Sequence, residues 1–215
     1  MRGLIITGGN IRDEFACENI KTGGYDMIMA ADSGMDFLYR NHLTPDIIVG
    51  DFDSVDHDAL DFFREDKRIE FCRLDPVKDD TDTEYAIRDA LSRGITQLTI
   101  LGGTGSRLDH VLGNISLLGI GLEENVEIEL VDEHNRVRMI DKPLSIRRDE
   151  QFGRFVSLIP YTGNVEHVTL TGFKYTLDDY TMGGFNSLGV SNEIKEEVAR
   201  IEFSSGILLV IESVD

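Results

Sequence analysis

Short, continuous apolar runs alternate with helical patterns through the first two-thirds of the chain. Each run ends at a glycine or at a turn that contains aspartate or serine. The runs are Leu4–Ile6, Met27–Ala31, Ile47–Val49, Leu98–Leu101 and Val126–Val131. Most of these runs lack polar alternation, which is typical of strands that are buried on both faces, as in a parallel sheet covered by helices. The pattern therefore predicts an α/β fold with a doubly wound, mostly parallel sheet.

Two of the intervening helices are well marked. Thr81 and Glu84 have the spacing of a capping box, and Gly94 follows where glycine favours a helix end. A second helix is expected to begin near Asp109. The apolar positions at helical spacing are Ala86, Ile87, Ala90 and Leu91 in the first helix, and Val111, Leu112, Ile115 and Leu118 in the second.

The pattern changes after about Ile140. Short strand-like runs separated by Gly, Asn and Asp turns follow one another without a long helical pattern. The expected strands are 145–147, 155–159, 165–170, 173–177, 198–203 and 207–211. We therefore expect a smaller all-β sandwich domain at 142–215, after an α/β domain at 1–141.

Charge narrows the possible partners. The chain has 40 acidic and 21 basic residues, a formal net charge of −19. Such a surface repels nucleic acids and anionic membranes, so we expect neither as a partner. It also repels free nucleotides, so an enzyme that acts on one must neutralise the phosphates locally, with a metal ion or a few placed cations.

Cysteine content and hydropathy indicate a cytoplasmic protein. Cys17 and Cys72 lie in no CxxC or Cys/His cluster, which favours reduced thiols. The apolar run near Met1 is too short for a signal peptide, and no stretch approaches the roughly 20 apolar residues of a membrane span.

Polar turns follow the predicted parallel strands. In open α/β sheets, ligands bind beyond the carboxyl ends of the strands, so these turns should meet at one edge. They are Gly8–Asn10, Ala31–Gly34, Gly50–Ser54 and Gly102–His110, with Lys78–Asp82 at the start of a helix.

Asp51 and Asp53 form the sharpest chemical pattern. Two carboxylates at this spacing in a glycine-flanked turn can converge on Mg²⁺, which is held by one or two carboxylates, waters and substrate phosphates. Asp82 is a third candidate ligand. Asp32 is either a ligand or an ordinary turn residue, and Asp79 and Asp80 are expected to cap or solvate the start of their helix.

Arg107 follows a run that contains Gly102, Gly103 and Gly105. Small residues allow backbone N–H groups to approach phosphates, and arginine binds their oxygens in a bidentate manner. The run is not a Walker A motif, because no Gly-Lys-Ser/Thr closes it. Roles for His110 and Asn114 stay open.

Taken together, the ordered motifs resemble thiamine pyrophosphokinase over nearly the whole chain. They are Ala31–Gly34, Gly50–Ser54, Asp79–Asp82, Gly103–His110, Gly172–Leu177, Ser191–Glu193 and Gly206–Val210. The resemblance implies a homodimer with the active site between subunits. It also implies that ATP and thiamine are converted to AMP and thiamine diphosphate.

The resemblance further assigns roles to individual residues. Asp51, Asp53 and Asp82 would hold Mg²⁺. The ATP and phosphate region would contain Asp32, Ser33, Gly103, Thr104, Arg107 and Asp109. Thiamine would be bound from the β domain by Ser191, Asn192 and Tyr175, with Tyr175 standing where some members carry a stacking tryptophan. The hydroxyl proton would pass to Asp109 or to a metal-site aspartate.

Three other functions compete with this one. A hydrolase of the haloacid dehalogenase type also uses a DxD turn after a strand, although there it follows the first strand, whereas Asp51 and Asp53 follow the third. A non-catalytic nucleotide-binding module would bind without turnover. A sugar-nucleotide transferase would use the same DxD turn to bind Mn²⁺.

Overall fold

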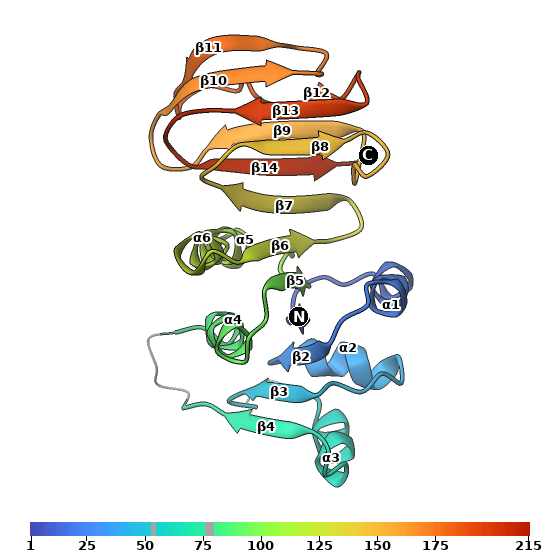
Figure 1. Ribbon diagram of the computed structural model, residues 1–215. Coiled ribbons are helices and arrows are strands. Elements are labelled where there is room, and N and C mark those ends of the chain that lie inside the picture. Colours follow the sequence, from blue (N-terminus) through green and yellow to red (C-terminus); the bar gives the residue numbers. More distant parts are fainter. Residues whose placement is uncertain (53–54, 76–79) are drawn as a thin grey trace. The chain divides into compact units, whose positions relative to one another are not determined.

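The computed structural model describes residues 1–52, 55–75 and 80–215, and the chain divides into two compact units (Figure 1). The first unit is Met1–Glu133 and the second is His134–Asp215. The sequence pattern places the boundary later, after residue 141. The units divide earlier because Asn135–Ile140 forms a strand that pairs along its length with the last strand of the chain.

The first unit is an α/β sheet whose strands are all parallel, in the order β6-β5-β1-β2-β3-β4. Its strands are β1 (Arg2–Ile6), β2 (Met27–Ala31), β3 (Ile47–Gly50), β4 (Glu70–Arg73), β5 (Gln97–Leu101) and β6 (Glu127–Val131). Its helices are α1 (Asp13–Thr22), α2 (Gly34–Arg40), α3 (His57–Glu65), α4 (Asp82–Ser92), α5 (Leu108–Leu117) and α6 (Gly119–Glu124).

Helices cover both faces of this sheet. Figure 1 shows α1, α2 and α3 on one face and α4, α5 and α6 on the other. The apolar runs are accordingly buried on both sides, with Leu4, Ile5 and Ile6 of β1 fully inaccessible. The predicted doubly wound fold is confirmed.

The chain reverses its direction of winding at β1. β1 lies between β2 and β5, so the turn after β1 and the turn after β5 lead to helices on opposite faces. At such a switch point the chain connections leave toward opposite faces, and ligands of α/β proteins bind there at the carboxyl ends of the strands. The sheet order therefore places a binding site here.

The helix that begins at Asp82 starts and ends as expected, with one difference. The Thr81 side chain accepts a hydrogen bond from the Glu84 amide at 3.1 Å, and Gly94 has a positive φ of 88° beyond the helix end. The Glu84 carboxylate, however, accepts two hydrogen bonds from Arg88 one turn later. The capping interaction runs in one direction because the arginine is the stronger partner for that carboxylate.

The second unit is a β-sandwich. Its antiparallel sheets have the orders β12-β9-β14-β7 and β11-β10-β13-β8. The strands are β7 (Asn135–Ile140), β8 (Leu144–Arg147), β9 (Phe155–Pro160), β10 (Val165–Thr171), β11 (Leu177–Met182), β12 (Asn192–Glu193), β13 (Val198–Glu202) and β14 (Leu208–Ser213). One buried apolar cluster contains side chains from both sheets, among them Val156, Leu170, Ile201 and Val210. The predicted all-β architecture is confirmed.

The strand expected at 173–177 is wrong. Phe173 forms only an isolated bridge with Ile194, and the regular strand β11 begins at Leu177. Gly172, with a φ of 79°, turns the chain beforehand. The amides of Lys174 and Tyr175 then bind the carbonyl of Glu193 and the side chain of Asn192, so they do not join a regular ladder.

Candidate active site

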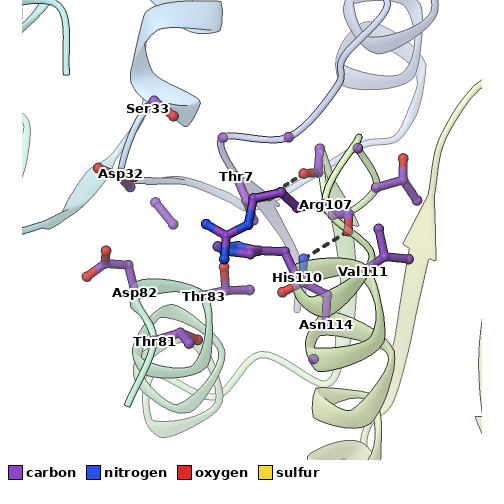
Figure 2. A pocket seen from close by; sticks show the side chains of 18 of the residues that line it. Thr7, Asp32, Ser33, Thr81, Asp82, Thr83, Arg107, His110, Val111 and Asn114 are labelled. Atoms are coloured by element: carbon purple, nitrogen blue, oxygen red, sulfur yellow. Dashed lines mark hydrogen bonds between the residues drawn. The ribbon is translucent and has the colours of Figure 1, made fainter. Parts of the chain in front are cut away.

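A cavity of about 660 Å³ lies at the switch point of the parallel sheet. Its wall is built from the turns after β1, β2 and β5 and from the first turns of α4 and α5 (Figure 2). This volume is within the range of pockets that bind cofactors and small substrates. Three of the four polar turns expected to meet at this edge line the cavity.

The turns after β1 and β5 are packed backbone to backbone. The Gly9 amide donates to the Gly102 carbonyl at 2.9 Å, and the Asn10 amide donates to the Thr104 carbonyl at 2.8 Å. A Cβ on Gly9 would lie only 2.1 Å from the Gly102 oxygen and 2.2 Å from the Thr104 oxygen. The cavity floor therefore requires glycine at position 9.

Two polar side chains stabilise the glycine-rich turn after β5 through hydrogen bonds to its carbonyl groups. Thr7 is buried and its hydroxyl donates to the Gly102 carbonyl at 2.6 Å. Asn114, in the second turn of α5, donates to the Gly103 carbonyl at 2.8 Å. The sequence does not decide the role of Asn114 and assigns none to Thr7. A polar residue at the end of a buried strand, such as Thr7, does indicate a hydrogen bond to a neighbouring turn. Both residues hold the loop that faces the ligand.

Arg107 and Asp109 form a bidentate pair at the start of α5. The Arg107 Nη2 and Nε groups donate to Asp109 at 2.6 and 3.2 Å. These hydrogen bonds lower the pKa of the Asp109 carboxyl to about 2. The two side chains are 68% and 66% exposed, so the pair adds little stability. The pair uses Nε and Nη2, and the guanidinium carries further N–H groups that can donate to the oxygens of a bound phosphate.

Besides Asp109, two of the predicted acidic residues line the cavity. Asp32 follows β2 with a positive φ of 53°, and Asp82 is the first residue of α4. Figure 2 shows Asp32, Ser33 and Asp82 on one side of the cavity, with the Arg107 side chain pointing toward them. Carboxylates thus face a cation across the space that a ligand would fill.

The structure does not bring the expected metal ligands together in full. Asp51 follows β3 and is half-buried, but it is not one of the described residues that line the cavity. Asp53 lies outside the described residues, as do Lys78 and Asp79. Within residues 1–52, 55–75 and 80–215, no group of three acidic, histidine or cysteine side chains is arranged to hold a metal ion.

The remaining predicted residues belong to the second unit. Tyr175 is 60% exposed, and the Lys174 ammonium lies 5.3 Å from its ring centroid. Ser191 has a positive φ of 59°, and its amide donates to the Ser157 hydroxyl at 3.0 Å. Asn192 is buried, and its carboxamide is bonded to the backbone of Tyr175.

Two family models match the chain, one in each unit. Residues 22–130 match the model described as "Thiamin pyrophosphokinase, catalytic domain", and residues 143–208 match "Thiamin pyrophosphokinase, vitamin B1 binding domain". The chain belongs to the thiamine pyrophosphokinase family. The resemblance drawn from the ordered motifs is confirmed.

Individual thiamine pyrophosphokinases agree over most of their length. The enzyme of Bacillus subtilis (strain 168) is 34% identical over 200 residues, which cover 90% of each chain. Thiamine pyrophosphokinase 2 of Arabidopsis thaliana is 29% identical over 81% of this chain and 68% of its own. The similarity therefore extends across both units.

Solved structures give the same result for the fold. A crystal structure of the Bacillus subtilis enzyme superimposes with a TM-score of 0.89 at 31% identity and covers all of both chains. A Geobacillus thermodenitrificans thiamin pyrophosphokinase gives 0.86 at 30% identity, covering all of this chain and 98% of its own.

Membership decides between the functions that the sequence left open. The chain is an enzyme, a pyrophosphoryl transferase that uses ATP and thiamine, and neither a phosphohydrolase nor a non-catalytic module. No helix in the described residues has the length and apolar character needed to cross a membrane.

Proposed function

We propose that the cavity at the ends of β1, β2 and β5 binds ATP and that the thiamine hydroxyl attacks the β-phosphorus. The bond from this phosphorus to the oxygen it shares with the α-phosphorus breaks, giving thiamine diphosphate and AMP. The observation that carries the proposal is the cavity itself. It combines closely packed glycine turns, the guanidinium of Arg107 and the carboxylates of Asp32 and Asp82.

In this proposal the chain acts mainly by positioning and by charge. Phosphoryl transfer requires little covalent chemistry from the protein, because charge builds up on phosphate oxygens that must be neutralised and aligned. Arg107 binds phosphate oxygens, and the turn at Gly103 and Thr104 lies against the nucleotide. Asp32 and Ser33 border the same space. Arg107 thereby supplies a positive charge to a cavity whose other charged lining residues, among those described, are acidic, which leaves the remaining phosphate charge to a metal ion.

Asp109 has a supporting role in this scheme. Its pKa of about 2 makes it a carboxylate at neutral pH but a weak proton acceptor. We assign it to the orientation of Arg107, which it holds through two hydrogen bonds. The hydroxyl proton of thiamine then passes to one of the aspartates Asp51, Asp53 and Asp82.

A divalent metal ion fits the chemistry of these groups. Mg²⁺ prefers carboxylate oxygens, waters and substrate phosphates, and Asp82 presents such a carboxylate in the cavity. Asp51 follows β3, which lies next to β2, since Ala31 pairs with Val49. Asp51, Asp53 and Asp82 would hold the ion, which when bound neutralises charge on the phosphates.

Thiamine is assigned to the second unit. It is a cation with aromatic rings, which suits the exposed ring of Tyr175 by stacking and cation–π attraction. The Ser191 hydroxyl is a polar contact on the neighbouring segment. The acidic surface of the protein attracts the same cation over longer distances.

We further propose a cytoplasmic homodimer in which the second unit of one subunit completes the cavity of the other. Exposed apolar side chains on α5 support an interface there. Leu108 and Leu112 are 73% and 63% exposed on the helix that carries Arg107. Leu112 had been expected on the buried face of this helix, but none of the α5 residues is buried in the single chain. Contiguous exposed apolar surface marks interaction sites.

A product assay tests the reaction. The protein is incubated with ATP, Mg²⁺ and thiamine, and the nucleotides are separated. AMP formed in step with thiamine diphosphate supports attack on the β-phosphorus. ADP with thiamine monophosphate would instead indicate attack on the γ-phosphorus, and phosphate release that does not depend on thiamine would indicate hydrolysis.

A mixing experiment tests the shared site. Asp51→Asn and Tyr175→Ala proteins, each inactive or weak alone, are mixed under conditions in which chains exchange. Partial recovery of activity is expected, because one of the two mixed sites contains both native residues. No recovery in mixtures with demonstrated exchange would refute a site formed between subunits.

A further inference from the structure

The segment Gly172–Leu177 connects two buried parts of the sandwich and carries one exposed aromatic ring, that of Tyr175. Phe173 is buried at 5% exposure, whereas Tyr175, two residues later, is 60% exposed. The Lys174 amide between them donates to the Glu193 carbonyl at 2.8 Å. The segment therefore lies along β12 and depends on β12 for its position.

The side chain of Asn192 clamps the backbone of Tyr175 on both sides. Its carboxamide oxygen accepts from the Tyr175 amide at 3.0 Å, and its nitrogen donates to the Tyr175 carbonyl at 2.7 Å. The same oxygen accepts from the Glu193 amide at 2.9 Å. Both acceptor positions of the oxygen are occupied, and the side chain is buried at 7% exposure. Little of it is left to contact a ligand.

Glu193 holds the neighbouring side chain. Its carboxylate accepts from Lys174 at 2.8 Å and from Lys195 at 3.0 Å, and it lies 3.5 Å from Arg154. Lys174, held in this way, stands 5.3 Å from the centroid of the Tyr175 ring. The backbone and one face of the tyrosine are thus both set by two consecutive residues of β12.

β12 is itself anchored to the sandwich. Asn192 and Glu193 pair with Val156 and Phe155 of β9, and the Ser191 amide donates to the Ser157 hydroxyl. Ser191 and Tyr175 are therefore held by the same short strand, on segments 16 residues apart in sequence. A preformed arrangement of a hydroxyl and a ring lowers the entropy cost of binding a rigid ligand.

We infer that Asn192 is a positioning residue for thiamine: it holds the Tyr175 ring in a fixed place relative to Ser191 and does not itself contact the substrate. The inference rests on the proposed function, in which Tyr175 and Ser191 contact thiamine. It replaces the direct binding role that the family resemblance suggested for Asn192. Asn192 affects the affinity for thiamine only by fixing the position of Tyr175.

A double-mutant cycle with steady-state kinetics tests this role. Asn192→Ala removes the clamp, and we expect the KM for thiamine to rise about tenfold with the KM for ATP and kcat within about twofold, as for the loss of two hydrogen bonds. Tyr175→Ala should raise the same constant. The double variant should be no worse than Tyr175→Ala alone, because the clamp then has no ring to position.

Two further proteins separate positioning from loss of stability. Asn192→Asp keeps the shape and the accepting oxygen but replaces the donor to the Tyr175 carbonyl by an oxygen that repels it. This variant should therefore also raise the KM for thiamine, even if Asn192→Ala folds poorly. Ile146→Val, a conservative change in the buried core of the same unit, should lower the Tm without changing that KM.

The outcomes are distinct. If the fold increases in the KM for thiamine caused by Asn192→Ala and Tyr175→Ala multiply in the double variant, the two residues make independent contacts with thiamine. That result would overturn the inference. So would a lowered Tm with an unchanged KM in both Asn192 variants, which would show a structural role alone. If the wild-type protein forms no AMP in the presence of thiamine, the proposed function fails, and the inference with it.

Discussion

Replacement of Gly9 by alanine tests the backbone contact that forms the cavity floor. The added Cβ would meet two carbonyl oxygens, of Gly102 and Thr104, at 2.1 and 2.2 Å. Both are backbone atoms of a turn that is held by Thr7 and Asn114, so they cannot rotate away as a side chain would. The turns after β1 and β5 must therefore separate.

The size of the effect follows from the hydrogen bonds between these turns. Relief of the clash moves the oxygens by about 1 Å, which takes the 2.9 Å bond from Gly9 and the 2.8 Å bond from Asn10 beyond hydrogen-bonding distance. Their loss costs about 1 kcal/mol each, and residual strain adds a similar amount. A total of about 3 kcal/mol corresponds to a fall in Tm of roughly 10 °C for a chain of this length.

Gly105→Ala is the matched control. Gly105 lies in the same turn and lines the same cavity, but a Cβ there would meet its nearest atom at 3.6 Å, an ordinary contact. Thermal unfolding by circular dichroism and the KM for ATP are measured for both variants. Gly9→Ala should lower the Tm and weaken ATP binding, whereas Gly105→Ala should leave the Tm nearly unchanged, because it meets no clash. Equal behaviour of the two variants would refute the close-approach argument.

Three other changes have defined outcomes. The fully buried Glu212 carboxylate pairs with Arg136 and Arg138. Glu212→Ala removes this partner and should lower the free energy of unfolding in urea by about 3–5 kcal/mol. A loss below about 1 kcal/mol would contradict a stabilising role of the carboxylate. Glu193, with its pKa lowered to about 2 mainly by hydrogen bonds from Lys174 and Lys195, stabilises the fold above its unfolded pKa of about 4.3. That contribution is lost as the pH falls from about 4.3 toward 2. Glu193→Gln should therefore show a smaller fall of Tm across this pH range than the wild-type protein. Parallel curves of Tm against pH for the two proteins would argue against a stabilising role of the Glu193 carboxylate. Asp82→Asn should lower kcat at least about tenfold at unchanged Tm. The exposed Asp58→Asn, with the same change in charge, should change neither kcat nor Tm, and an equal loss of kcat in both variants would refute the role of Asp82.

The regular elements of the first unit were largely predictable because burial on both faces leaves an unbroken apolar run. Met27–Ala31 coincides with β2, and the helix capped by Thr81 begins one residue later, as expected. Elements with weaker local signals were missed. β4 is a partly exposed edge strand, and β12 is only two residues long. Neither carries an apolar run that sequence periodicity can detect.

Several properties of the candidate site could also be predicted from the sequence. The order of Asp32, Gly103, Arg107 and Asp109 within polar turns after apolar strands indicated a phosphate site and the family. The turns that carry these residues line one cavity because parallel strands bring their carboxyl ends to one edge whatever the details of packing. The charge of −19 likewise indicated that phosphate has to be neutralised locally.

The three-dimensional contacts decided what each residue does there. Thr7 and Asn114 support the glycine turn, Arg107 pairs with Asp109, and Asn192 holds the backbone of Tyr175 instead of facing solvent. These assignments depend on atoms that are distant in sequence, and local propensity and periodicity contain no information about such pairs. The sequence alone determined the class of fold and the family, because both depend on the order of apolar runs and polar turns along the chain. Tertiary packing decided which side chains are exposed in the cavity and which hold other groups in place.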